Sequence, residues 1–119
     1  MRETQILSVS DRTGKPGGNW IKFMNTATAE RMPRESLAGF TLLMWIAYKM
    51  RLDNSPNVHG LRKCEAFLWP DTRRTLHLTE NQFRNAKRFL ATRRHATFRR
   101  AYRGTIARLV SRNVFAPPD

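Results

Sequence analysis

Cysteine, acidic residues and long apolar runs are all scarce in this chain of 119 residues. Cys64 is the single cysteine, so it has no partner for an internal disulfide, and alone it cannot hold a structural zinc ion. The longest apolar run, LLMWIAY, is too short to span a bilayer, and the N-terminus lacks the apolar stretch of a secretory signal. We therefore expect a cytoplasmic protein that is not embedded in a membrane.

The scarcity of acidic residues leaves a large positive excess, with 22 Lys and Arg against 9 Asp and Glu and a net charge of +13. Residues 73–119 contain 12 basic and 2 acidic residues, an excess of +10, whereas residues 1–72 contain 10 and 7, an excess of +3. Charge this one-sided repels itself in the folded state, which favours a polyanionic partner. Nucleic acid is the leading candidate and an anionic membrane surface the second; the simple alternative is that the charge serves solubility.

The apolar content predicts one small folded domain. Hydrophobic residues make up 40% of the chain and include three Trp and seven Phe, which is enough for a single core and argues against intrinsic disorder. The sequence TGKPGGN makes residues 1–19 a flexible lead-in. We therefore place the folded domain at residues 20–119, where NWIKFMN either begins a short strand or places Trp20 in the core.

The segment PRESLAGFTLLMWIAYKMRLD predicts one helix. Pro33 suits its first turn, and Glu35 near its start complements the helix dipole. Nearly every position over residues 40–48 is apolar, and Gly39 permits a neighbouring backbone to come close. Two interpretations remain open: this helix is the centre of the core, or it forms a homodimer through residues 35–51.

A short strand and a short helix are predicted next. LRKCEAFLWP places Cys64, Ala66 and Leu68 on one alternating face, as in a strand with one buried side. Cys64 is then a small buried apolar residue. DTRRTLH predicts a short helix capped by Asp71.

The segment LTENQFRNAKRFLATRR predicts a helix from Glu80 to about Arg93. Thr79 and Gln82 have the spacing of a capping box, in which each side chain bonds the backbone of the other residue. At about 100° per residue, the apolar positions share one face: Phe83, Ala86 and Leu90. The opposite face contains only side chains that can bond bases or phosphates: Asn81, Arg84, Asn85 and Arg88.

A hairpin is predicted after this helix. ATFRR and GTIARLV form its strands, and the turn runs from Ala101 to Gly104, with Gly104 taking the positive φ. Tyr102 is expected to pack along the hairpin rather than to stack on a base. Val114 and Phe115 are expected to return to the core. The cations near the tip are Arg99, Arg100 and Arg103.

The order of helix, strand, short helix, capped helix and hairpin is that of a winged helix-turn-helix. We therefore expect an α+β fold that is mainly helical, with the C-terminal β-hairpin as the wing. Arg bonds guanine bidentately and Asn bonds adenine in the same way, so the polar face of the capped helix offers candidates for base edges. The arginines of the wing are candidates for phosphates, which supply most of the affinity while base contacts supply selectivity.

The second half of the chain, KCEAFL followed by LTENQFRNAKRFLATRRHATFRRAYRGTIARLVSRNVF, resembles the winged-helix segment of small phage and bacterial replisome organisers and replication initiators. The resemblance implies DNA binding through Gln82, Arg84 and Lys87 on the helix and through Gly104 and Thr105 in the wing. The chain departs from the family pattern at WP after the strand and at TRRHAT, where relatives carry glycine, and in its three wing arginines. The implied role is that of a replication accessory protein or transcriptional regulator of a phage or mobile element.

A protein partner is the main alternative. A small phage protein of this fold can inhibit a host nucleoprotein complex by binding an acidic surface, as anti-CRISPR proteins do. Double-stranded DNA is favoured over RNA as the nucleic-acid partner. Catalysis has little support, because the region from 73 onwards holds one carboxylate before the C-terminus, Glu80, which capping explains. The histidines are too scattered to suggest a metal site, so we expect neither metal nor cofactor: His59, His77 and His95.

Overall fold

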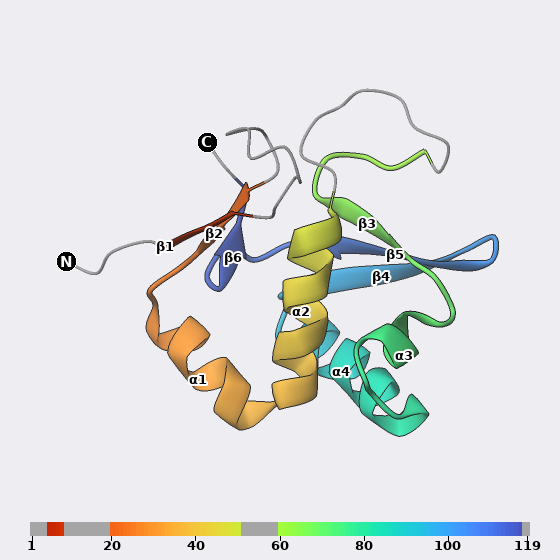
Figure 1. The fold of residues 1–119 in the computed structure, drawn as a ribbon, viewed down its shortest axis with the longest axis horizontal. Coiled ribbons are helices and arrows are strands. Elements are labelled where there is room, and N and C mark those ends of the chain that lie inside the picture. The colour runs from red at the N-terminus through yellow and green to blue at the C-terminus, as the bar shows by residue number, and fades with distance from the viewer. Residues whose placement is uncertain (1–4, 9–19, 51–59, 118–119) are drawn as a thin grey trace.

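The computed structural model describes residues 5–8, 20–50 and 60–117, which form an α+β fold of helices and two small antiparallel sheets (Figure 1). The elements are β1 (Gln5–Ser8), β2 (Trp20–Phe23), α1 (Ala27–Glu35), α2 (Leu37–Lys49), β3 (Glu65–Leu68), α3 (Thr72–Thr75), α4 (Glu80–Thr92), β4 (Ala96–Ala101), β5 (Gly104–Leu109) and β6 (Phe115–Ala116). The sheets have the strand orders β1-β2-β6 and β3-β5-β4, and α2 packs against α1, α4 and strands of both sheets. None of the described helices is long and apolar enough to cross a membrane.

Two helices occupy the stretch where the sequence predicts one. The helix predicted over residues 35–51 forms as Leu37–Lys49, but its predicted start at Pro33 is wrong, because α1 and α2 meet at Ser36, whose backbone is extended at φ −156°. The Ser36 N–H donates to the Met32 carbonyl at the end of α1, and the Ser36 hydroxyl accepts from the Gly39 N–H at 2.9 Å to cap α2. Pro33 therefore lies near the end of α1 and not in the first turn of a longer helix.

The N-terminal sheet includes residues that the sequence assigns to a flexible lead-in. Gln5–Ser8 pairs antiparallel with Trp20–Phe23, so the lead-in prediction does not hold for this strand; residues 9–19 lie outside the described residues. β6 completes the sheet, with Phe115 opposite Phe23. Val114 and Phe115 are buried, which confirms the predicted return of the chain to the core.

α2 is the central helix of the core. Its side chains with almost no exposure are Leu42, Leu43, Ile46 and Ala47. α4 packs on α2 with Ala86 and Leu90 fully buried, as its apolar periodicity predicts. Gly39 allows a close approach as expected, but of a side chain and not of a backbone, since a Cβ there would lie 2.8 Å from a ring carbon of Phe89.

The predicted strand and short helix between α2 and α4 form as β3 and α3. Cys64 is buried together with Ala66 and Leu68, as predicted, but Glu65 is buried as well, so the strand is not buried on one side alone. Asp71 precedes α3 as expected, but its side chain makes no capping hydrogen bond, so the predicted cap is wrong. α3 is a single turn, too short to need a strong cap.

The turn of the hairpin differs from the prediction in which residue takes the positive φ. Arg103 does so, at φ 63°, and Gly104 does not. Gly104 is required for another reason, because a Cβ there would lie 2.5 Å from the backbone oxygen of Leu68 and 2.7 Å from the Phe67 ring. The turn therefore packs directly against the end of β3 at a position where only glycine fits.

α4 ends in a Schellman motif built on arginine. The Arg94 N–H donates to the Ala91 carbonyl, and the His95 N–H donates to the Leu90 carbonyl at 2.8 Å. Arg94 takes a left-handed φ of 59°. This conformation costs a residue with a Cβ about 1–2 kcal/mol, which glycine avoids. Because TRRHAT has no glycine, Arg94 takes the left-handed conformation at the end of α4 and is strained there.

Arg94→Gly should raise the free energy of unfolding by about 1 kcal/mol, because glycine adopts the left-handed conformation without the Cβ penalty. Urea unfolding followed by circular dichroism measures the change. Arg93→Gly is the matched control: Arg93 has an ordinary φ of −84°, so the same truncation there should give no gain. An Arg94→Gly protein that is no more stable than the wild type would contradict the strain at this position.

Candidate nucleic-acid interface

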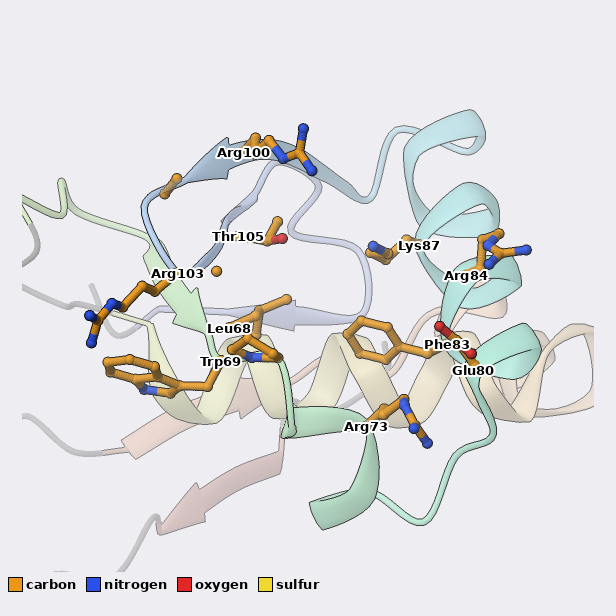
Figure 2. A pocket seen from close by; sticks show the side chains of 13 residues that line it. Leu68, Trp69, Arg73, Glu80, Phe83, Arg84, Lys87, Arg100, Arg103 and Thr105 are labelled. Atoms are coloured by element: carbon orange, nitrogen blue, oxygen red, sulfur yellow. The ribbon is translucent and has the colours of Figure 1, made fainter.

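A groove of about 620 Å³ runs between α4 and the β4–β5 hairpin, and the end of β3 together with α3 completes its wall (Figure 2). We call it the α4–hairpin groove. The charged side chains among the described residues that line it are Arg73, Glu80, Arg84, Lys87, Arg100 and Arg103. The lining thus contains five cations and one carboxylate. They come from three separate elements, α3, α4 and the hairpin, so the fold and not the local sequence gathers them.

The groove has two distinguishable ends. Arg100 on the hairpin and Lys87 on α4 lie on opposite sides of it, and the Phe83 ring lies on the α4 side next to Lys87 (Figure 2). Trp69 and Arg103 lie at one end in this view, and α4 with its carboxylate lies at the other. Apolar walls and gathered cations together concentrate positive potential inside the groove.

The capping box and the apolar face of α4 set the direction of its side chains. Both halves of the box are present, with the Gln82 N–H donating to Thr79 Oγ1 at 3.1 Å and the Thr79 N–H donating to Gln82 Oε1 at 2.8 Å. The prediction of this helix start is confirmed. Arg84 and Lys87, three residues apart, face the groove, and Lys87 Nζ lies 5.1 Å from the centre of the Phe83 ring.

The other side chains predicted on this helix lie outside the groove. Asn81, Asn85 and Arg88 are exposed on α4 but do not line the groove. Gln82 is also exposed, and its carbonyl oxygen is engaged in the cap. α4 therefore offers two surfaces: a groove side with Arg84 and Lys87, and an exposed outer side with the two asparagines and Arg88.

The hairpin divides its arginines between two faces. Arg100 and Arg103 line the groove with Gly104 and Thr105, as the wing prediction requires. Arg99, which the sequence places with them near the tip, does not line the groove. Adjacent residues of a strand point to opposite faces, so Arg99 turns away from Arg100 and its guanidinium forms an ion pair with the Glu65 carboxylate on β3.

Glu65 explains why Arg99 is held. Its side chain is 2% exposed, and its carboxylate accepts from the Arg99 guanidinium and from the Arg62 backbone N–H at 2.7 Å. The hydrogen bond from Arg99 lowers the pKa of Glu65, against the effect of burial, so the carboxylate stays charged near neutral pH. A buried carboxylate is costly without such a partner. Arg99 therefore neutralises a charge inside the protein.

Arg73 and Trp69 line the groove, although the sequence analysis did not predict them as contacts. Arg73 belongs to the short helix before α4, and Trp69 follows β3. In the sequence, Arg73 is one of a basic pair in DTRRTLH, and Trp69 stands out only as a departure from the family pattern. Neither sequence feature predicts that Arg73 or Trp69 lies near α4 and the hairpin, because this position depends on how β3 pairs with β5.

The histidines give no metal cluster among the described residues, where no three His, Cys, Asp or Glu side chains lie together. His95 is buried and stacks beside Phe89, and burial, followed by the charge of Arg93, lowers its pKa. Arg93 itself pairs with Glu35 at 3.0 Å. His59 lies outside the described residues.

Arg99→Ala should lower the free energy of unfolding at neutral pH by about 2 kcal/mol, because it leaves the buried Glu65 carboxylate without its cation. The pKa of Glu65 is lowered in the folded protein, so the pair stabilises fully above the pKa of an unfolded glutamate and loses its effect as the pH falls through the folded value. The difference in the free energy of unfolding between wild type and Arg99→Ala should therefore become smaller in acid. Urea unfolding over a pH series measures this difference.

Arg100→Ala is the matched control for Arg99→Ala in these unfolding measurements. Arg100 is adjacent, carries the same side chain and is exposed on the opposite face of β4. Its removal should change stability by no more than about 0.5 kcal/mol at any pH. Equal losses from the two substitutions would show that Glu65 does not depend on Arg99.

In comparisons with known proteins, no family model, no curated protein and no solved structure matches the chain.

Proposed function

We propose that this chain is a small DNA-binding protein with a winged-helix fold, in which α4 enters the major groove and the hairpin lies on the phosphate backbone. The observation that carries the proposal is the convergence of five cations on the α4–hairpin groove, against one carboxylate among the described residues that line it. Phosphates are the ligands that such a surface recognises most directly. The net charge of +13 adds long-range attraction to a polyanion.

The element order supports the winged-helix assignment. α2, β3, α3, α4 and the β4–β5 hairpin follow one another as the helices, strand and wing of that fold do, and the sheet order β3-β5-β4 places the wing beside the strand. The hairpin extends away from the helices (Figure 1). α1 and the β1-β2-β6 sheet lie outside this pattern, and α3 is only one turn long.

The side chains divide into two roles under this proposal. Arg84 and the outer side of α4, with its asparagines, suit base edges, since Arg and Asn make bidentate bonds to guanine and adenine. Lys87, Arg100 and Arg103 suit phosphates, because they line the groove on both sides of the path that a backbone strand would take. Arg73 extends this phosphate surface onto α3.

A role in replication or transcription of a phage or mobile element rests on the family resemblance alone. Duplex DNA is favoured over RNA because the deep, narrow major groove of an A-form helix does not admit side chains for reading. Contacts between α4 and the base edges would determine which DNA sequence the protein prefers.

One observation favours a second candidate, a protein partner. Leu37, Met44 and Tyr48 are exposed on one side of α2, where their spacing of seven and four residues aligns them. Exposed apolar side chains that share a helix face suit a protein contact. That contact is either a second copy of this chain, as in the predicted homodimer, or a host protein whose acidic surface the cations would bind, as in an anti-CRISPR protein.

Direct binding of duplex DNA separates the two candidates. Fluorescence anisotropy with a labelled duplex of random sequence should show binding at low salt. The logarithm of the affinity should fall with the logarithm of salt concentration with a slope of several units, at about 0.9 per phosphate contacted. No binding at low salt would remove duplex DNA as the partner and leave the protein contact.

Arg84→Ala and Arg100→Ala should separate base reading from phosphate binding. Arg84→Ala should relax sequence preference and cost about 1–3 kcal/mol on the preferred sequence, because one base contact is lost. Arg100→Ala should weaken binding to all sequences alike and reduce the salt slope by about 1. Selection from random duplexes identifies the preferred sequence, and anisotropy measures both variants on it.

Arg99→Ala is the hairpin control for these measurements. Its charge is already neutralised by Glu65, so under conditions where the variant stays folded its DNA affinity should stay near that of the wild type. Equal, sequence-independent losses from Arg84→Ala and Arg100→Ala would argue against base reading by α4.

A further inference from the structure

The tip of the hairpin presents exposed aromatic rings beside the groove. Tyr102 occupies the turn between β4 and β5 and is 83% exposed, so the expectation that it packs along the hairpin is wrong. Trp69 is 49% exposed where the chain leaves β3. Leu68, the residue before Trp69, pairs with Thr105 near the start of β5. Trp69 therefore lies beside the turn of the hairpin. Large exposed rings on a cationic surface are typical of a contact surface.

Each ring has a contact with a neighbouring side chain at this end of the sheet. The Arg103 guanidinium lies 5.1 Å from the centre of the Tyr102 ring. Trp69 meets the Phe67 ring edge-on, with 4.6 Å between ring centres. Phe67 in turn lies against Gly104, where a Cβ would come within 2.7 Å of its ring. Both rings therefore lie at the hairpin-turn end of the β3-β5-β4 sheet and keep large exposed surfaces.

The charged groove residues nearest to Trp69 are arginines. Trp69 and Arg103 lie together at one end in Figure 2, with Arg100 further along the hairpin. Glu80, the carboxylate of the groove, lies at the α4 end. A nucleic-acid strand that passes the hairpin tip would therefore meet cations for its phosphates and rings for its bases.

We propose that Tyr102 and Trp69 form a stacking platform for an unpaired base, so that the protein prefers duplex DNA that opens into a single strand. This inference rests on the proposed function. Bases inside a duplex stack on one another and show only their edges in the grooves, so an exposed ring gains little from them. A base just beyond the duplex has a free face, and stacking on an aromatic ring is tolerant of sequence.

Affinity for matched DNA ends tests the platform. The full chain is titrated into a blunt duplex and into the same duplex extended by a short single-stranded tail. The tailed duplex should bind about tenfold more tightly, as stacking of one base on an aromatic ring predicts. With 2-aminopurine as the first unpaired base, its fluorescence should fall on binding, because stacking quenches it.

Substitutions at the two tyrosines of the chain provide the variant and its control. Tyr102→Leu removes the ring at an exposed position, so it should abolish the preference for the tail and leave affinity for the blunt duplex unchanged. Tyr102→Phe keeps the ring and should keep the preference. Tyr48→Leu makes the same change on α2, at a side chain that is 44% exposed, and should have no effect on either ligand. Trp69→Leu should also reduce the preference.

Two results would overturn the platform. One is equal affinity of the wild type for blunt and tailed duplexes, and the other is a Tyr102→Leu protein that retains both the preference and the quenching of 2-aminopurine. In either case, intact binding of the blunt duplex leaves the proposed function standing. Failure to bind any of these DNAs would overturn both proposals together.

Discussion

The contact between the hairpin turn and the end of β3 is the constraint on which the candidate interface depends. Gly104 lies so close to the Leu68 backbone oxygen and the Phe67 ring that a Cβ would have to displace one of them. This contact fixes the hairpin against β3, and α3 and α4 follow directly after β3 in the chain. The position of the hairpin cations relative to the α4 cations therefore depends on the β3–β5 pairing and on this close contact, which needs a glycine.

Charge alone does not define the interface, because the arginines of this chain serve different purposes. Arg99 neutralises the buried carboxylate of Glu65, and Arg93 pairs with Glu35. Arg94 closes the Schellman motif at the end of α4 in a strained conformation. Arg73, Arg84, Arg100 and Arg103 line the groove. The large positive excess of the second half thus includes arginines with structural roles and arginines that line the groove.

The rigidity of α4 connects the core to that surface. Its first turn is held by a complete capping box, its last by the Schellman motif, and its apolar face by α2. α2 also joins the two sheets, so α4 is anchored to the centre of the molecule. A helix held at both ends and along one side presents its remaining side chains in a defined direction, which base recognition by hydrogen bonds requires.

Signals that act within a few residues were enough to predict the elements around the groove. The Thr79–Gln82 box, the apolar spacing of α4 and the glycine-containing hairpin are all local, and their elements formed at the predicted places. The break between α1 and α2 was missed because the cap at Ser36 interrupts an apolar pattern that looks continuous. The sheet β1-β2-β6 was missed because it joins strands from opposite ends of the sequence.

The assignment of individual arginines shows most clearly what tertiary structure decided. Arg99 and Arg100 are adjacent and chemically identical, so nothing in their local sequence distinguishes them. The pleat of β4 sends them to opposite faces, and Glu65, 34 residues away, captures one of them. Local sequence determined that a basic helix and a basic hairpin would form. Only long-range strand pairing decided which of their cations face the groove, because that pairing determines what each side chain meets.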